Sequence, residues 1–555
     1  MNKILAFALI VLLIALSVLG YFYNELKNDY SNVFEILRNK RVEGNLIIDN
    51  EYNYDYEFIN DDGIFVSYEI LKEIIDSTVE LSNSKTRVYI EIDKLDFKLE
   101  TDELTEYVNN NLDRINIPIK FIEEKKYINL DLLSKLYPIF YNYYESENVL
   151  YINTNIEKIK KYSSNNNKNV YYLEEDLLIK FDELGKNSEF IYLDNKVIKS
   201  DKYSKIITSK GEIGYIIAEN TNLIDENFSK ENRLNEVREA EQLDTISLMW
   251  DSISKYSDLK NFNVDKIENL NVISPTWFAL NIDGIVINEA SLKYIDDSHK
   301  NGYQVWALYK NSFDPVWTNQ LLTNEEYIDK SIAQIVFYSS LYNVDGINID
   351  FENIYLKNKD ALTDYVRKLR KYTKMQNLTL SIDAVVPGGS DQYSKVIDRE
   401  AIIDYVDYFM LMAYDEHWSS SPKSGSVASI PWVIKGIEGT LETVNNDKLV
   451  LGVPLYMRVW TEKNRKVLSS EAYAIKNIGS YLEKIDYEII YDEASGQNYI
   501  ETTKKGNTIK IWIEDKESLI KRINLINEYN LKGIAGWRKG YEESYYYDLV
   551  DIYMK

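Results

Sequence analysis

Residues 344–353 read Val344-Asp345-Gly346-Ile347-Asn348-Ile349-Asp350-Phe351-Glu352-Asn353, and apolar residues alternate there with acidic or amide residues. On a β-strand, this period of two places Asn348, Asp350 and Glu352 on one face. Strands of a parallel barrel are usually apolar on both faces. A row of polar groups there must therefore have hydrogen-bonding partners or serve a function. Barrel enzymes carry their chemistry at the C-terminal ends of the strands, and Glu352 stands where this strand is expected to end.

The spacing of the carboxyl groups predicts an unusual protonation state. Closely spaced carboxyls in a poorly solvated site cannot all ionise freely, so at least one of them should have a raised pKa. A carboxylic acid that stays protonated near neutral pH is the group needed to protonate a leaving glycosidic oxygen. The same spacing also arises by chance in α/β proteins, so other strands have to support this interpretation.

From about Asp244 to the C-terminus, strand-like apolar runs alternate with amphipathic helical stretches, the pattern of βαβ units. Eight such runs predict a (β/α)₈ barrel in an α/β chain. A longer gap with strand-like pieces of its own, at about residues 461–515, predicts a small α+β insertion. The predicted strands are Ile246–Trp250, Val272–Phe278, Gln304–Tyr309, Asp345–Glu352, Leu378–Val385, Tyr408–Tyr414, Leu449–Pro454 and Ile534–Arg538.

Three segments resemble family 18 of the glycoside hydrolases, the chitinase-like barrels. Val344 to Glu352 fits the active-site signature of that family at every position. Met410-Leu411-Met412-Ala413-Tyr414-Asp415 matches the motif at the end of its sixth strand, and Gly533-Ile534-Ala535-Gly536-Trp537-Arg538 matches its last strand. The resemblance covers roughly residues 244–555.

A departure narrows this resemblance to one branch of the family. The usual Ser-x-Gly-Gly at the end of the third strand is replaced by Ala307-Leu308-Tyr309-Lys310-Asn311. This difference, together with Val272-Ile273-Ser274-Pro275-Thr276-Trp277, fits the bacterial spore-cortex and peptidoglycan N-acetylglucosaminidases.

The resemblance implies roles for particular residues. Glu352 would be the general acid/base, Asp350 would orient the 2-acetamido group of the substrate, and Tyr414 would hydrogen-bond its carbonyl; these three are the catalytic candidates. The substrate-binding candidates are Asn348, which can hydrogen-bond Asp350, and Asp415, Trp537, Trp277 and Tyr456. Trp537 would form the apolar floor of the cleavage subsite, and Trp277 and Tyr456 would line the cleft.

The resemblance also implies a mechanism. The N-acetyl oxygen of the substrate would act as the nucleophile and form an oxazolinium ion, so the reaction would retain anomeric configuration. The substrate would be a cell-wall or chitin-like glycan. Two alternatives stay open: a glycan-binding protein on an inactive barrel, and a germination or surface protein whose barrel serves assembly. The presence of Glu352 favours catalysis.

Composition excludes several other functions. The chain of 555 residues has a formal net charge of -25, which argues against nucleic acid as a partner. It has no cysteine and only two histidines, so it has no disulfide framework and no Cys nucleophile. We predict neither a metal site nor a cofactor. The length predicts two to four domains.

The N-terminus predicts a membrane segment. Lys3 precedes an apolar run from Ile4 to about Tyr23, long enough to cross a bilayer as one helix. The early lysine favours a cytoplasmic N-terminus and an exported body. A cleaved signal peptide has a similar start, but the run is long and lacks a convincing cleavage site. We therefore predict an uncleaved single-pass anchor over residues 1–24 in the cell membrane, with a secreted protein as the alternative.

Two small modules are predicted between the anchor and the barrel. Short strands and two amphipathic helices over residues 30–160 resemble, by pattern only, the small α+β module named from the N-terminal region of copper amine oxidases, without its copper ligands. Strands over residues 170–235 resemble a bacterial SH3-like module. The polar run at residues 163–169 predicts a linker between them.

Overall fold

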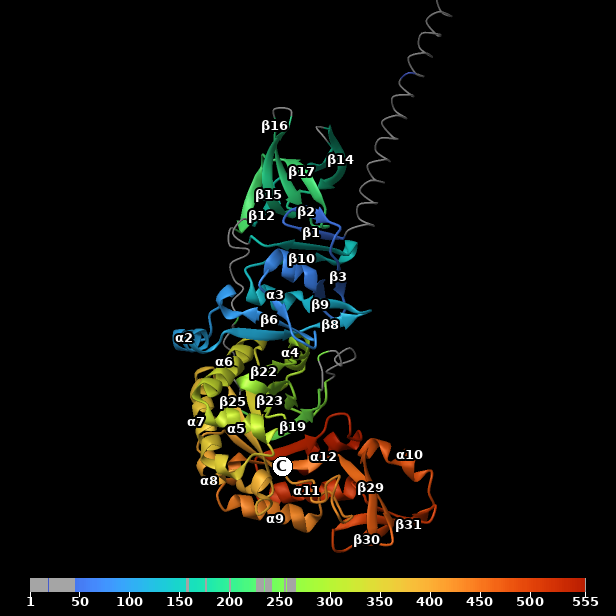
Figure 1. Cartoon of the computed structure of the whole chain (residues 1–555). Coiled ribbons are helices and arrows are strands. Elements are labelled where there is room, and N and C mark those ends of the chain that lie inside the picture. The colour runs from blue at the N-terminus through green and yellow to red at the C-terminus, as the bar shows by residue number, and fades with distance from the viewer. Residues whose placement is uncertain are drawn as a thin grey trace, which may run out of the picture. The chain divides into compact units, whose positions relative to one another are not determined.

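The structure is a computed structural model of the whole chain (Figure 1). It describes residues 18, 45–155, 159–174, 177–198, 201–225, 234, 242–253, 256 and 266–554. The chain forms two compact units, one of Met1–Ser77 with Ile122–Arg233 and one of Thr78–Phe121 with Leu234–Lys555. The predicted anchor over residues 1–24 lies outside the described residues, apart from Val18. Of the helices that are described, none has the length and apolarity needed to span a bilayer.

Eight parallel strands in the second unit close into a barrel, which confirms the predicted fold of this region. Each strand pairs in parallel with the next, β20 pairs with β23, and β33 pairs with both β27 and β19, so the barrel is closed. The strands are β19 (Ile246–Asp251), β20 (Val272–Pro275), β23 (Gln304–Lys310), β24 (Gly346–Asp350), β25 (Thr379–Val385), β26 (Tyr408–Met412), β27 (Leu449–Pro454) and β33 (Gly533–Trp537).

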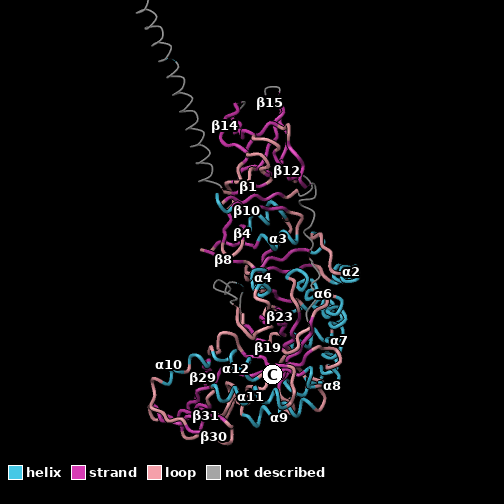
Figure 2. Tube along the Cα trace, turned by 180° about the vertical axis from the view of Figure 1, so that it is seen from behind, coloured by secondary structure: helices cyan, strands magenta, loops and turns pink. Residues whose placement is uncertain are grey.

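Helices lie on the outer side of these strands, as Figure 2 shows for α6 and α7. In α7, Leu362, Val366 and Leu369 recur at helical spacing and are all buried, so this apolar stripe faces the barrel. The helices of this layer are α4 (Leu292–Lys300), α5 (Pro315–Thr323), α6 (Glu325–Tyr342), α7 (Lys359–Met375), α8 (Arg399–Ile402), α9 (Ile430–Leu441), α11 (Lys516–Glu528) and α12 (Tyr545–Tyr553).

The interior of the barrel is filled by large side chains. Trp306 stacks on Tyr408 with ring centroids 5.5 Å apart, next to buried residues such as Leu248 and Met410. Gly346, at the start of β24, makes this packing possible: a Cβ there would lie 2.8 Å from both the Thr379 carbonyl oxygen and the Trp306 ring. The glycine of the 344–353 segment therefore serves close packing, and the chemistry lies further along the strand.

Between β27 and α11 the chain forms an antiparallel five-stranded sheet where the sequence predicts an insertion. The sheet begins at Tyr456, directly after β27, so its first strand starts close to the end of a barrel strand. Its order is β29-β28-β32-β31-β30, with β28 (Tyr456–Lys463), β29 (Lys466–Ala474), β30 (Ile490–Asp492), β31 (Gln497–Lys504) and β32 (Asn507–Trp512). The short helix α10 (Gly479–Leu482) precedes β30.

Residues 78–121 belong to the barrel unit, which divides the module predicted over residues 30–160. They form β5 (Glu80–Leu81), β6 (Arg87–Glu91), α2 (Asp102–Asn111) and β7 (Arg114–Pro118). The hydrogen-bond partners of the buried Asn116 are far away in the sequence. Its Nδ2 donates to the Val286 carbonyl at 2.8 Å, and its N–H donates to the Tyr338 hydroxyl at 2.9 Å. Such distant partners cannot be found from a local sequence pattern.

The first unit is built mainly of sheets. One has the order β10-β11-β1-β2, and a seven-stranded antiparallel sheet has the order β14-β13-β17-β16-β15-β12-β18. The linker predicted at residues 163–169 is wrong in part, because β12 and β13 take up most of it and are paired into the larger sheet. The SH3-like resemblance stays a prediction.

The bounds of the elements in this first unit, together with β8, which spans the division between residues 121 and 122, complete the description. They are β1 (Leu46–Ile48), β2 (Glu51–Asn53), β3 (Phe58–Asn60), β4 (Ile64–Ser67), β8 (Lys120–Ile122), β9 (Lys125–Asn129), α3 (Leu130–Leu136), β10 (Phe140–Tyr144), β11 (Val149–Asn153), β12 (Lys160–Ser164), β13 (Lys168–Glu174), β14 (Leu177–Leu184), β15 (Glu189–Ile198), β16 (Asp201–Ile207), β17 (Ile213–Ile217) and β18 (Thr221–Asp225).

Candidate active site

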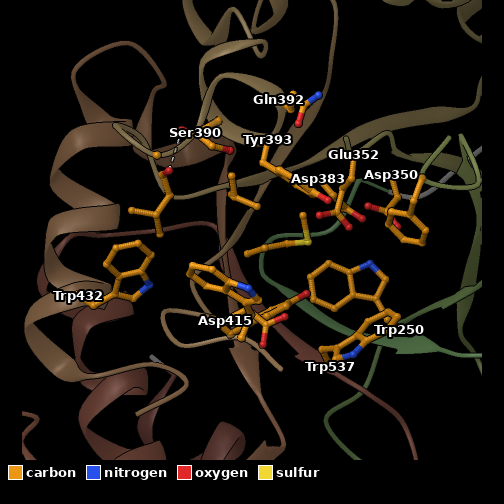
Figure 3. Close-up of a pocket in the computed structure, with 18 residues that line it drawn as sticks. Trp250, Asp350, Glu352, Asp383, Ser390, Gln392, Tyr393, Asp415, Trp432 and Trp537 are labelled. Carbon is orange, nitrogen blue, oxygen red and sulfur yellow. Dashed lines mark hydrogen bonds between the residues drawn. The ribbon is translucent and has the colours of Figure 1, made fainter. Parts of the chain in front are cut away.

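A pocket of about 790 Å³ opens at the C-terminal ends of the barrel strands (Figure 3). Five of the eight predicted site residues line it: Glu352, Asp350, Tyr414, Asp415 and Trp537. The full lining is Trp250, Phe313, Asp350, Glu352, Asp383, Val385, Val386, Gly389, Ser390, Gln392, Tyr393, Ser394, Met412, Tyr414, Asp415, Trp418, Trp432 and Trp537.

The two carboxyls of the 344–353 segment both have raised pKa values. Burial raises the pKa of Asp350 to about 6, although the nearby charge of Lys310 acts in the opposite direction. Burial raises the pKa of Glu352 to about 8, and the charges of Asp350 and Asp415 add to this effect. At neutral pH, Glu352 therefore holds its proton while Asp350 is largely ionised, which is the pairing that an acid catalyst beside a carboxylate needs.

Asn311 fixes the backbone that carries Glu352. Its Nδ2 donates to the Glu352 carbonyl oxygen at 2.6 Å, and its Oδ1 accepts the Glu352 N–H at 3.1 Å. The Asn311 side chain is itself fully buried and donates to Thr318 Oγ1 at 2.8 Å. Asn311 belongs to the segment at the end of the third strand that differs from the usual family motif, so this difference supplies the side chain that holds the backbone of Glu352.

Asp415 is held by the five-stranded insertion. The Tyr456 hydroxyl donates to Asp415 Oδ1 at 2.5 Å, and Arg458 lies 4.0 Å from the same oxygen. Asp415 has a φ of 58°, in the left-handed region that residues other than glycine seldom adopt. Tyr456 is buried and does not line the pocket, so its predicted role in the cleft is corrected: it orients a lining residue.

Asn348 lies beneath the pocket. It is fully buried and is absent from the lining, so the structure corrects its predicted place as a substrate contact. The predicted hydrogen bond to Asp350 is also wrong, because Asn348 Nδ2 donates instead to Asp383 Oδ1 at 2.8 Å. On the other side of the amide, Trp250 Nε1 and Ser274 Oγ donate to Asn348 Oδ1 at 2.9 and 3.2 Å.

Trp277 is a core residue. Its side chain is fully buried against Tyr294, with ring centroids 5.1 Å apart, and it does not line the pocket. The predicted cleft position is therefore wrong. Trp250 occupies the place expected of such an aromatic residue: its ring meets those of Tyr414 and Trp537 edge-on, at 6.4 and 6.1 Å between centroids. Aromatic faces of this kind suit the apolar faces of sugar rings.

Asp383 is the most important residue that the sequence reasoning missed. It is buried, lines the pocket and comes from β25, next to the strand that carries Asp350. Its pKa is raised well above the ordinary value because it is buried and lies near the charges of Asp350 and Glu352. An acidic residue inside the otherwise apolar run Leu380–Val386, broken besides only by Ser381, was the available signal. The aromatic residues Tyr393, Trp418 and Trp432 come from loops and helices and gave no comparable signal.

The described residues contain no group of three or more histidine, cysteine or acidic side chains arranged to hold a metal ion. The titratable side chains among the lining residues are four carboxyls and two tyrosines, one of which is Tyr414. Burial raises the pKa of Tyr414 well above its ordinary value, so its hydroxyl stays a donor.

Comparison with known proteins assigns the class. Residues 291–542 match the family model of glycosyl hydrolases family 18. Over these residues, which make up less than half of the chain, the barrel resembles that family, and a glycosidase is the class of enzyme that the comparisons support.

Three similar proteins come from Bacillus species. The chain is 20% identical over 320 residues to the uncharacterized glycosylase YvbX of Bacillus subtilis (strain 168), which covers 55% of this chain and 90% of that protein. It is 27% identical over 234 residues to the cortical fragment-lytic enzyme of the same organism. This match covers 40% of this chain and 52% of that protein. The crystal structure of the Bacillus cereus spore cortex-lytic enzyme SleL shares the fold, with a TM-score of 0.50, 19% identity and coverage of 55% of this chain and 73% of that chain.

Proposed function

We propose that this protein hydrolyses β-linked N-acetylglucosamine glycans of the peptidoglycan or chitin type, with retention of configuration and with Glu352 as the acid/base. The observation that carries the proposal is the position of Glu352, which follows the end of β24 and lines the pocket beside Asp350 and Asp383, with tryptophan residues on its other side (Figure 3). A partly buried acid with a pKa of about 8 can deliver a proton at neutral pH.

The carboxyls of the pocket support a substrate-assisted route. Asp350 is the last residue of β24, Glu352 follows it, and Asp383 lies on the adjacent strand β25; the three carboxyls are drawn together on one side of the pocket (Figure 3). The carboxyl drawn apart from them belongs to Asp415, which is already bonded to Tyr456. A protein nucleophile on the face of the sugar opposite the acid is therefore not provided by this group of three, whereas an acetamido oxygen on the substrate would provide one.

The steps follow from this placement. Glu352 gives its proton to the glycosidic oxygen as the bond to the anomeric carbon breaks, and the acetamido oxygen bonds to that carbon. Asp350 accepts the acetamido N–H, and the Tyr414 hydroxyl donates to the acetamido oxygen. Glu352, now ionised, takes a proton from water as the water attacks the anomeric carbon and opens the ring. Both displacements invert, so the overall result is retention.

The substrate class draws support from the relatives. A cortical fragment-lytic enzyme is named for acting on fragments of spore cortex, and we propose a cell-wall glycan for this chain on that likeness. We further propose that the apolar run Ile4–Tyr23 anchors the chain in the cell membrane with the body outside, because this would bring the barrel to the wall. Secretion after cleavage is the alternative.

Digestion of purified peptidoglycan and of chitin oligomers tests the proposal. Mass analysis should find new reducing ends on N-acetylglucosamine, and early products should have the β configuration by NMR. Inverted products would overturn the mechanism. Binding of both glycans without any new reducing ends would instead support a glycan-binding protein on an inactive barrel.

A further inference from the structure

One oxygen of the central carboxyl lacks a hydrogen-bond donor. Asp350 Oδ1 is buried and has no hydrogen-bond partner among the residues that the structure describes. Asp350 is 7% exposed, so water has little access to compensate. Leaving a buried carboxylate oxygen without a donor is costly, and such atoms in a functional pocket call for a specific explanation.

Asn348 determines which oxygen of the neighbouring Asp383 can carry a proton. The indole N–H of Trp250 can only donate, and it donates to Asn348 Oδ1 at 2.9 Å. This fixes the orientation of the amide, so the Asn348 Nδ2 group faces Asp383 and donates to its Oδ1 at 2.8 Å. Asp383 Oδ1 is therefore an acceptor, and Oδ2 is left as the atom that can hold a proton.

The groups around Asp383 are mostly acidic. Figure 3 draws its carboxyl beside those of Glu352 and Asp350. The groups that act on these three carboxyls are Asn348 and Asp350 from β24, Glu352 just after it, Trp250 from β19, Tyr414 after β26, Lys310 from β23 and Asp415. Of these, only Lys310 is a cation, and it acts on Asp350. Two buried carboxyls and a partly buried one, with one nearby cation, cannot all be ionised.

We propose that Asp383 is a positioning residue that acts through Asp350. Its carboxyl is neutral in the working site, accepts from Asn348 at Oδ1 and donates from Oδ2 to the Asp350 carboxylate. The donated hydrogen bond supplies the partner that Asp350 Oδ1 lacks, and holds Asp350 ionised and turned toward the acetamido group. This inference deepens the proposed function and rests on it.

Two substitutions at residue 383 separate a neutral donor from a charged carboxylate. Asp383→Asn keeps the size, accepts from Asn348 and can still donate to Asp350, so it imitates the neutral acid. Asp383→Ala removes the donor. Ser381→Ala is the matched control, because Ser381 lies two residues earlier on the same strand, is fully buried, and does not line the pocket.

The expected kinetics on N-acetylglucosamine oligomers differ between these variants. Asp383→Asn should keep most of the wild-type kcat, with the acidic limb of the pH–rate profile unmoved. Asp383→Ala should lose kcat on the order of 10–100-fold with little change in KM, the size seen when a supporting hydrogen bond is removed. Its acidic limb should move to higher pH, because an Asp350 without a donor binds its proton more tightly.

A charged Asp383 predicts the opposite result. Removing a negative charge would lower the pKa of Asp350, so Asp383→Asn would move the acidic limb to lower pH. That shift would overturn the proposal, as would an Asp383→Ala profile identical to that of Ser381→Ala. If Asp383→Ala does not fold, the Asn variant alone decides.

Infrared spectroscopy tests the protonation without any turnover. The difference spectrum of wild type minus Asp383→Asn at pH 7 should contain the carbonyl stretch of a neutral carboxylic acid. The wild type minus Ser381→Ala spectrum should lack this band. Its absence from the first spectrum overturns the proposal. Because this readout needs no substrate, it is independent of whether the chain cleaves the glycans proposed above.

Discussion

The barrel pocket and a cleft in the first unit are both lined by carboxyls and tyrosines, yet their electrostatics are opposite. The second one, which we call the Glu57 cleft, has a volume of about 610 Å³. It is lined by Tyr54, Asp55, Tyr56, Glu57, Ser67, Glu69, Glu73 and Lys125. Composition alone would rank the two as similar acidic sites.

The difference lies in burial and in the nearest cation. In the Glu57 cleft, Lys125 Nζ lies 2.8 Å from the Glu57 carboxylate, and this contact lowers the pKa of Glu57. The side chain of Glu57 is 45% exposed, whereas desolvation is the main cause that raises the pKa of Glu352, which also has acidic neighbours. A carboxyl remains protonated at neutral pH, and can then donate its proton, only where it is poorly solvated and has no cation close by. This is why we assign the chemistry to the barrel pocket.

The largest expected effect tests that assignment. Glu352→Gln keeps the shape and hydrogen bonding of the side chain but removes its transferable proton, so turnover of N-acetylglucosamine oligomers should fall by about 10²–10⁴-fold. Glu57→Gln is the matched control and should leave turnover unchanged. Equal turnover of Glu352→Gln and wild type would show that the acid is another group.

Removal of the Tyr414 hydroxyl should have the next largest effect. Tyr414→Phe deletes the donor aimed at the acetamido oxygen, and loss of one such donor lowers kcat by about 10²-fold or more in other sites. A thiazoline analogue of the cyclised intermediate should inhibit the wild type and bind this variant less tightly. A fully deacetylated glycan, which has no acetamido oxygen, should resist both. Rapid cleavage of it, with a sugar trapped on a carboxylate, would contradict the substrate-assisted route.

The pH dependence of kcat/KM should reflect the two raised pKa values. Activity needs Asp350 ionised and Glu352 protonated, so it should fall below about pH 6 and above about pH 8. Beyond each limb the loss should approach tenfold per pH unit. An enzyme whose acid resembled Glu57, with a lowered pKa, would instead lose activity well below neutral pH; a basic limb in that range would contradict the assignment.

Sequence reasoning succeeds where one strand carries the signal. The alternation along residues 344–353 places Asp350 and Glu352 correctly, because a strand's period of two is a local property. The eight strands of the barrel follow from apolar runs for the same reason.

It fails where the partner comes from a distant part of the chain. Asp383 reaches the site through the pairing of β24 with β25, and Asn311 reaches Glu352 from the end of β23. Trp277 and Trp250 have similar sequence contexts at the ends of strands, and only the packing shows that Trp277 faces Tyr294 and Trp250 faces the pocket. No local pattern distinguishes these two.

The smallest expected effect of these substitutions is on the stability of the protein, and its pH dependence compares the two clefts directly. The folded-state pKa of Glu352 lies above its ordinary value, so its contribution to stability is fully present at low pH and is lost as pH rises through about 8. Glu352→Gln should therefore unfold at a higher temperature than wild type at alkaline pH, and at a similar temperature near pH 5.

The contribution of Glu57 to stability has the opposite pH dependence: its lowered pKa gives stability that is present at neutral pH and is lost as pH falls. Glu57→Gln should lower the free energy of unfolding by at most about 1 kcal/mol at pH 7, since the pair with Lys125 is exposed. Thermal unfolding of both variants across pH measures this, and a Glu352→Gln protein less stable than wild type at high pH would mean that Glu352 is not held protonated by burial.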